Sequence, residues 1–290
     1  MKDYVGENQR ILERWKEKFI EEFGADNEWK FAPDGIMNKG EFSAPDKNGV
    51  IWRERSNSEG TKENDLWSNA PLRVLFLTKD ENLYDDSIVA WDVSRETFHA
   101  KSSKIEEYKA SSSFFYKNEA NILYGLLHTS PTSMMGFEEF AVNDAVRFSD
   151  ELIFARINCK KEGGQDTVTN SELYDTINKD YYFLKDQVLN FDADIFLCCG
   201  TQNDENPTLD FLYDIYKNEF VKCDYGTNKS TAVHYNEKRN KLALDIYHLA
   251  FSHSGGEKAR YYEAIGAYYS FIKYLKNTNG VDFTKSHRQK

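Results

Sequence analysis

The chain has 290 residues, of which 40% are hydrophobic and 29% are charged, and its formal net charge is −11. This length allows one sizeable hydrophobic core, and the acidic balance excludes the broad basic surface that usually drives nucleic-acid binding. No apolar run reaches the roughly 18 residues that a membrane span needs, so we expect no contact with a membrane.

The first 70 residues combine one helical pattern with a long irregular segment. Apolar residues between positions 4 and 23 recur at helical spacing with charged residues between them, which predicts a surface helix. Residues 24–70 contain many Gly and Pro residues and little periodicity, with at most a short strand at 50–53. We therefore expect residues 1–70 to pack around a core formed by residues 71–290.

From residue 71 the chain alternates between apolar strands and helical patterns. Branched apolar runs predict strands that are covered on both faces, and apolar residues at helical spacing predict helices. Ser171 is the expected N-cap of the second of these helices. In chain order we predict a strand at 72–78, a helix at 118–128, a strand at 152–159, a helix at 171–190, a strand at 194–200, a helix at 209–220, strands at 231–236 and 241–248, and a helix at 257–276.

This alternation predicts an α/β fold, a three-layer α/β/α sandwich around a central, mainly parallel four-stranded sheet. The short link between 231–236 and 241–248 predicts a hairpin, so one strand of this pair runs antiparallel. In such sheets, ligands bind in the crevice beyond the carboxyl ends of the strands.

Polar residues stand where these buried strands end. Asp80 follows the first strand, Asn158 ends the second, Gly200 ends the third and His248 ends the last. Each has an ordinary structural interpretation, since Asp can cap a turn and His can be a satisfied buried imidazole. Their shared position nevertheless predicts one pocket that contains a carboxylate, an amide and an imidazole.

The four cysteines bear on cofactors and on location. Cys198 and Cys199 are neighbours inside an apolar run, and the cysteines show no C-x-x-C spacing. This pattern argues against a disulfide framework, a zinc ribbon and a cysteine-ligated iron–sulfur cluster. We expect no metal and no cofactor, and a cytoplasmic location.

The segments VLFLTKDEN, FARINCKK, ADIFLCCG and DIYHLAFSH, in this order over about residues 71–276, resemble the motifs of the uracil-DNA glycosylase superfamily. Members carry an Asp- or Asn-bearing loop after the first core strand, a strand ending in a base-reading Asn, and a last strand ending in a His-Pro-Ser-type loop. The resemblance implies that fold, and a hydrolase that cleaves the N-glycosidic bond of uracil or of a damaged base in DNA.

The resemblance also implies roles for individual residues. Asp80 would activate water and stabilise the cationic sugar, with Asn82 as a second candidate for holding that water. Asn158 would read the edge of a pyrimidine, and His248 would donate to the oxygen where negative charge develops. The implied aromatic wall against the flipped base is Trp91 or Phe98.

DNA or a nucleotide is the implied partner, and several residues near the mouth would contact it. Apolar residues of the loop after His248 would form a wedge into the duplex, and nearby cations would meet phosphates despite the acidic net charge. The residues expected to do so are Lys79, Lys160, Lys161, Leu249, Phe251 and His253, with Lys258 and Arg260 also near the mouth.

Other functions remain open from the sequence. The first motif has Thr78-Lys79-Asp80-Glu81 where members typically have Gly-x-Asp-Pro, and the last has His248-Leu249-Ala250 in place of His-Pro-Ser. These departures favour an alternative, a non-catalytic module that binds a nucleotide or nucleic acid on the same fold. A flavodoxin-like protein would need a Ser/Thr/Gly-rich loop after the first strand, and a Ser-His-Asp hydrolase would need a G-x-S-x-G elbow. Neither pattern occurs.

Overall fold

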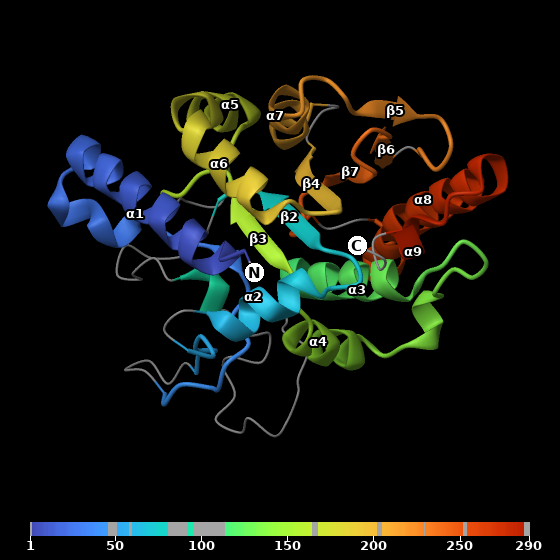
Figure 1. Cartoon of the computed structure of the whole chain (residues 1–290), viewed down its shortest axis with the longest axis horizontal. Helices are drawn as coiled ribbons and strands as arrows, with labels where there is room; N and C mark the ends of the chain where they lie inside the picture. The colour runs from blue at the N-terminus through green and yellow to red at the C-terminus, as the bar shows by residue number, and fades with distance from the viewer. Residues whose placement is uncertain are drawn as a thin grey trace.

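A mixed seven-stranded sheet forms the centre of the molecule (Figure 1). The computed structural model describes residues 2–45, 51–57, 60–80, 92–95, 114–163, 168–201, 205–228, 230–251 and 254–286. The strands lie in the order β1-β3-β2-β4-β7-β6-β5. Their bounds are β1 Gly35–Ile36, β2 Val74–Thr78, β3 Ala155–Asn158, β4 Ile195–Thr201, β5 Val221–Cys223, β6 Thr231–Asn236 and β7 Lys241–Tyr247.

The four strands β3, β2, β4 and β7 run parallel to one another, while β1, β6 and β5 join the sheet through antiparallel pairs. The α/β class is therefore confirmed, and β6 and β7 form the expected hairpin. The prediction of a mainly parallel four-stranded sheet is wrong, because it omits β1, β5 and the mixed character of the whole sheet. β1 has two residues and β5 three, and strands this short leave almost no periodic pattern in the sequence.

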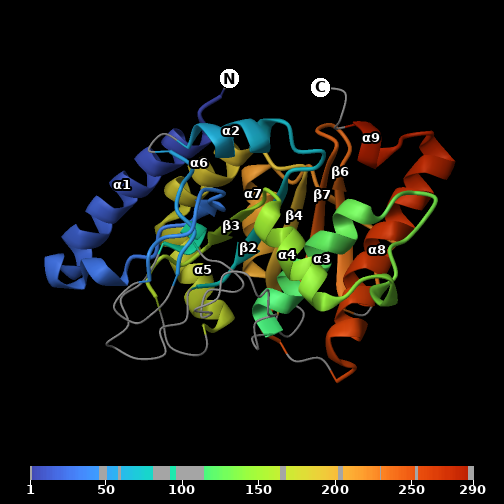
Figure 2. The same ribbon diagram turned by 90° about the horizontal axis from the view of Figure 1, so that it is seen from below.

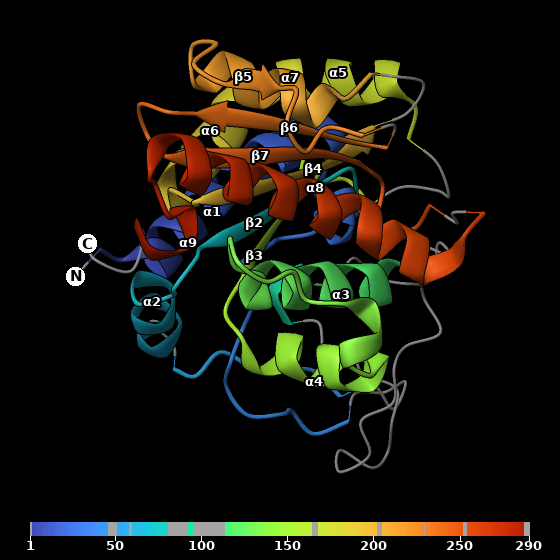
Figure 3. The same ribbon diagram turned by 90° about the vertical axis from the view of Figure 1, so that its right-hand side faces the viewer.

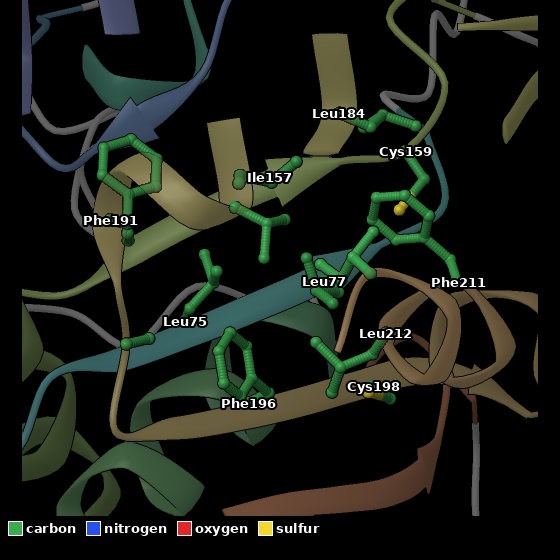
Figure 4. Packing of buried hydrophobic residues seen from close by; sticks show 14 of the residues in the cluster. Leu75, Leu77, Ile157, Cys159, Leu184, Phe191, Phe196, Cys198, Phe211 and Leu212 are labelled. Carbon is green, nitrogen blue, oxygen red and sulfur yellow. The ribbon is translucent and has the colours of Figure 1, made fainter. Parts of the chain in front are cut away.

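Helices cover both faces of the sheet (Figure 1, Figure 3). On one face, residues of α1, α2, α5, α6 and α7 share a buried cluster with alternate strand residues such as Leu75, Leu77 and Phe196 (Figure 4). On the other face, α3, α4, α8 and α9 pack on the intervening strand residues, such as Val74 and Phe76. The bounds are α1 Tyr4–Phe23, α2 Thr61–Ser68, α3 Phe114–His128, α4 Val142–Glu151, α5 Asn170–Lys179, α6 Tyr181–Phe191, α7 Pro207–Ile215, α8 Gly256–Asn279 and α9 Phe283–Ser286, with short 3-10 helices η1 Ala25–Lys30, η2 Val93–Arg95 and η3 Phe137–Glu139.

The amino-terminal segment is built into this core. The buried side of α1 packs against α6, and β1 pairs with the edge of β3. In α2, the indole of Trp67 is fully buried and donates a hydrogen bond to the carbonyl of Phe191 at 3.0 Å. Residues near both ends of this segment therefore belong to the same hydrophobic cluster as the sheet.

The region between β3 and β4 differs from the single helix predicted at 171–190. It contains α5 and α6, separated at Asp180. The N-cap is Thr169, whose hydroxyl accepts from the amide of Glu172 while the Glu172 carboxylate accepts from the amide of Thr169. This T-x-x-E capping box satisfies two amide groups at once, which Ser171 one position inside the helix could not do.

On one face of the sheet, α3 and α8 lie side by side (Figure 2). The two helices come into close contact at Gly125 in α3. A Cβ atom at this position would lie 2.6 Å from Ile265 and 2.7 Å from Tyr261, both on α8. The missing side chain thus sets the separation of α3 and α8. Among the helices that the structure describes, none combines the length and the apolar character needed to cross a bilayer.

Candidate functional site

The sheet has a point where its connections change sides. β2 comes first in sequence among the four parallel strands, and it lies between the second, β3, and the third, β4. The chain passes from β2 to β3 through α3 and α4 on one face, and from β3 to β4 through α5 and α6 on the other. Such a reversal opens a crevice at the carboxyl ends of the strands. Lys79 and Asp80, which follow β2, stand at this point.

Asp80 carries an acceptor without a donor. Its Oδ2 atom is buried and receives no hydrogen bond from the part of the chain that the structure describes. Burial raises the pKa of Asp80 to about 6, although the charges of Lys160 and Lys79 act in the opposite direction. A buried carboxylate without a full set of donors costs free energy, and a pKa near neutrality suits a group that takes up a proton at physiological pH.

His248 carries the complementary atom, a donor without an acceptor. The amide of Ala250 donates to its Nδ1 at 3.4 Å, which assigns the ring proton to Nε2. Nε2 is buried and has no hydrogen-bond partner among the described residues. Burial, with further contributions from the charges of Lys79 and Arg260, lowers the pKa of His248 to about 4. The imidazole is therefore neutral at physiological pH, and its Nε2–H can donate.

Asp80 and His248 stand at the same edge of the sheet with one strand between them. Asp80 follows β2, His248 follows β7, and β4 separates the two strands. Neighbouring strands lie about 4.8 Å apart, so the two strand ends are separated by about 10 Å. The charge of Lys79 acts on both groups, which places Lys79 within electrostatic reach of each. Asp80 and His248 therefore stand on either side of β4 at this edge of the sheet.

Asn158 lies at the same edge, but its groups are used inside the protein. It is 1% exposed, and its Oδ1 accepts a hydrogen bond from the Thr78 hydroxyl at 2.5 Å. Its backbone amide donates to Asp34 Oδ2 at 2.7 Å, and its backbone carbonyl accepts from the ammonium of Lys161 at 2.7 Å. Asn158 in this arrangement connects β3 to its neighbours, and its side-chain oxygen is not offered to a ligand.

Most of the cations expected to contact phosphates are buried or paired with a carboxylate. Lys161 is 2% exposed and pairs with Asp34 at 2.5 Å, and Arg260 is 3% exposed. Lys79 is also buried, and the exposed Lys258 forms an ion pair with Glu138. Lys160 remains partly exposed near Asp80. The basic surface expected at the mouth is thus much smaller than the sequence suggested.

The two loop residues expected to form an apolar wedge differ in their exposure to solvent. Leu249 is fully buried among residues of α3 and α8, and Phe251 is 49% exposed. The carbonyl of Leu249 accepts a hydrogen bond from Asn118 at 2.7 Å, which holds this part of the loop against α3. Of the two residues, only Phe251 presents its side chain to solvent. The remaining expected site residues, Asn82, Trp91, Phe98 and His253, lie outside the described residues.

An aromatic ring that the sequence did not single out lies beside the imidazole. Phe115, in the first turn of α3, is partly buried and has its ring centroid 5.8 Å from that of His248. The guanidinium of Arg156 lies 4.9 Å from the Phe115 ring, and Arg156 forms a buried ion pair with Glu119 at 2.7 Å. The nearest sequence signal was the helical pattern of α3, which says nothing about proximity to β7.

Comparison with protein-family models, characterised proteins and solved structures gives no match. No known site is therefore available for transfer to these residues. In the described ranges no three His, Cys, Asp or Glu side chains gather as a metal site would require. The chemistry of the crevice has to be argued from its own atoms.

Proposed function

We propose that the chain hydrolyses the N-glycosidic bond between a nucleobase and its sugar, in a nucleotide or at an accessible position in DNA. One observation carries the proposal: an unsatisfied acceptor, Asp80 Oδ2, and an unsatisfied donor, His248 Nε2, are buried at one edge of the sheet. Other buried polar atoms of the described residues also lack a partner, among them His234 Nε2, but this acceptor and this donor follow two strands of one sheet edge. Unpartnered buried atoms at such a place can mark positions that a ligand completes. The motif order that resembles the uracil-DNA glycosylase superfamily supplies the reaction type.

The reaction needs a carboxylate on the sugar side. Cleavage of the bond between C1′ and the base nitrogen leaves the electron pair on the base and positive character on the sugar, and a water oxygen then bonds to C1′. In this proposal the ionised Asp80 stabilises the sugar cation and accepts the proton that the water loses. Its pKa of about 6 keeps it mainly ionised at neutral pH and still basic enough for this transfer.

The reaction also needs a donor on the base side. As the base leaves, negative charge develops on its ring and on its carbonyl oxygens. A neutral His248 would donate its Nε2–H to such an oxygen from a fixed position, and Phe115 would flank the same side. Removal of one preorganised donor of this kind commonly reduces kcat by about 10²- to 10³-fold.

The charges near the crevice support a substrate with few phosphate contacts. Binding along duplex DNA depends on several exposed cations, and most of the cations near this mouth are buried or paired with carboxylates. A nucleotide, a single strand or a chain end would need fewer such contacts. We therefore favour these substrates over the interior of a duplex.

The test is a base-release assay over nucleosides, nucleotides, and single- and double-stranded oligonucleotides that contain uracil or damaged bases. Asp80→Asn and His248→Ala should each reduce release by roughly a hundredfold or more. Asp186→Asn, which changes a carboxylate of α6 whose side chain is 54% exposed, is the matched control and should leave the rate unchanged.

Two outcomes would count against the proposal. Release at the wild-type rate by both the Asp80 and His248 variants would show that the chemistry lies elsewhere. Saturable binding of a nucleotide without release of any base would favour the alternative of a non-catalytic binding module on the same fold.

A further inference from the structure

A buried guanidinium bonds the backbone of the residue that carries the imidazole of the candidate site. Arg260, in the second turn of α8, is 3% exposed. Its Nη2 atom donates to the carbonyl of Tyr247 and, at 3.0 Å, to that of His248. The aromatic ring of Tyr247 lies 5.6 Å from the guanidinium carbon. The strand end that carries His248 is therefore held by a positive charge.

This charge has no directly bonded carboxylate. Three other buried cations each pair with one: Arg156 with Glu119 at 2.7 Å, Lys161 with Asp34 at 2.5 Å, and Lys241 with Asp192 at 2.7 Å. Arg260 forms no ion pair with the described residues, and Glu263 acts on it only at longer range. A buried charge without a counter-charge costs several kcal/mol.

The position of Arg260 adds to this cost. It lies near the amino end of a 24-residue helix, where the helix dipole is positive and disfavours a cation. Carbonyl acceptors compensate only part of the loss of hydration. Lys39 is likewise buried with carbonyl acceptors, but Arg260 differs from it in standing at the strand end that carries His248. A negative group of a ligand would stabilise this charge.

A second buried cation follows β2, at the same edge of the sheet as His248. Lys79 is 8% exposed and donates to the carbonyl of Val168 at 3.4 Å. The charges of Lys79 and Arg260 both disfavour a proton on His248, so both act on the space around its ring. Asp80, next to Lys79 in the chain, stands on the sugar side of the proposed reaction, and Arg260 holds the backbone on the imidazole side.

We propose that Arg260 and Lys79 form an anion subsite beside His248, which binds a negatively charged group of the ligand. The inference rests on the proposed function only in taking the ligand to be a molecule that carries a base. The anion is then either a phosphate group of a nucleotide or the leaving base, which becomes anionic as the C1′–N bond breaks. Two buried cations would stabilise either charge in a space of low polarity.

The test compares inorganic phosphate, uridine and uridine 5′-monophosphate as probes by calorimetric titration, and measures base release from the last two. The variants are Arg260→Gln and Lys79→Met. Arg239→Gln is the matched control, because Arg239 lies in the turn between β6 and β7, at the opposite edge of the sheet, and pairs with Glu219. Arg260→Lys keeps the charge and is a second variant in case Arg260→Gln does not fold.

If the anion is a phosphate, the wild type binds inorganic phosphate, and it binds the monophosphate at least about tenfold more tightly than uridine. Arg260→Gln and Lys79→Met then remove this preference, whereas Arg260→Lys and Arg239→Gln retain it. If the anion is the leaving base, the two probes bind alike, and the first two variants reduce base release from uridine by roughly tenfold or more.

An NMR titration of His248 provides a measurement that does not depend on turnover. Removal of either positive charge should raise the pH at which the imidazole titrates. The anion subsite is overturned if phosphate does not bind, if neither variant changes binding or base release, and if His248 titrates as in the wild type. Phosphate binding that depends on Arg260, without any base release, would retain the subsite and refute the proposed hydrolase.

Discussion

The carboxyl ends of β3 and β7 present two polar residues in contrasting surroundings. At the end of β3, the amide, the carbonyl and the side-chain oxygen of Asn158 all have partners within the protein. At the end of β7, the backbone of His248 is held by Arg260, but the Nε2 atom of the ring has no partner among the described residues. Strand-end position alone does not identify a functional residue. The atom that is held rigidly and left unsatisfied is the better indicator.

The cations that bond the backbone at these two strand ends also differ in their partners. Lys161 behind β3 is neutralised by Asp34, so that end of the sheet is complete in electrostatic terms. Among the residues that the structure describes, Arg260 at the end of β7 bonds only to carbonyl oxygens. The first arrangement stabilises the fold, and in the proposed subsite the second would provide positive potential for a ligand.

The largest expected effect concerns the completed end. Lys161→Ala would leave the carboxylate of Asp34 buried without its counter-charge, and we expect a loss of about 3–5 kcal/mol in the free energy of unfolding, measured with urea. Lys179→Ala, which breaks a half-exposed pair with Glu22, should cost less than about 1 kcal/mol. A similarly small loss in both variants would mean that the buried pair of Lys161 and Asp34 does not stabilise the end of β3 as described.

The loop after β7 should divide into a structural and an exposed part. Leu249→Ala removes a fully buried side chain and should lower the free energy of unfolding by about 2–5 kcal/mol. Phe251→Ala changes a half-exposed ring and should alter stability by less than about 0.5 kcal/mol. Thermal or urea unfolding measures both changes, and equal effects would contradict the burial of Leu249.

Removal of the Asp80 carboxylate, which lacks a hydrogen-bond donor at Oδ2 among the described residues, should make the fold more stable. Because the pKa of Asp80 is raised from 3.8 to about 6 on folding, the folded protein binds more protons than the unfolded chain between these values, and stability falls as the pH rises through this window. The difference in unfolding free energy between Asp80→Asn and the wild type should therefore shift in favour of the variant by up to about 3 kcal/mol between pH 4 and pH 7.5. A difference between variant and wild type that does not change with pH would contradict the shift.

The smallest effect concerns Lys160, which is partly exposed beside Asp80. Its positive charge lowers the pKa of the carboxylate, so Lys160→Ala should raise that pKa. The acid limb of the base-release profile should move to higher pH by roughly half a unit or less, since partly exposed charges are screened by salt. A shift that is as large at high salt as at low salt would argue against this electrostatic origin.

The predictable part of the fold is the part with long, regular patterns. The run LRVLFLT gave β2 because five successive buried residues need covering on both faces, and the α3, α7 and α8 patterns had one apolar side each. β5 could not be found in this way, since its residues are exposed or half-exposed and Val221 is 65% exposed. α4 was missed because no change in apolar character separates its ten residues from the preceding FEEFA. Its N-cap residue is Ala141, which has no side chain that could mark the start of a helix.

The sequence could place Asp80 and His248 at one edge of the sheet, because the carboxyl ends of parallel strands meet at one edge. It could not identify the hydrogen-bond and ion-pair partners at this edge, and the role of both residues in a site stays a prediction. The sequence could not show that Lys161 meets Asp34, 127 positions away, or that Arg260 of α8 reaches the carbonyl of His248. Two adjacent lysines usually suggest a solvated pair, and only the fold separates Lys160 at the mouth from Lys161 in the interior.

The close approach of α3 and α8 at Gly125 has a consequence for how the sequence can vary. The same two helices carry Asn118 and Arg260, which hold the carbonyls of residues 247 to 249. A larger residue at 125 would push the helices apart and would release the loop that aims the imidazole. In a saturation library selected for the function of this crevice, position 125 should accept glycine and reject even alanine, although it lies far from the crevice in sequence and contacts no ligand.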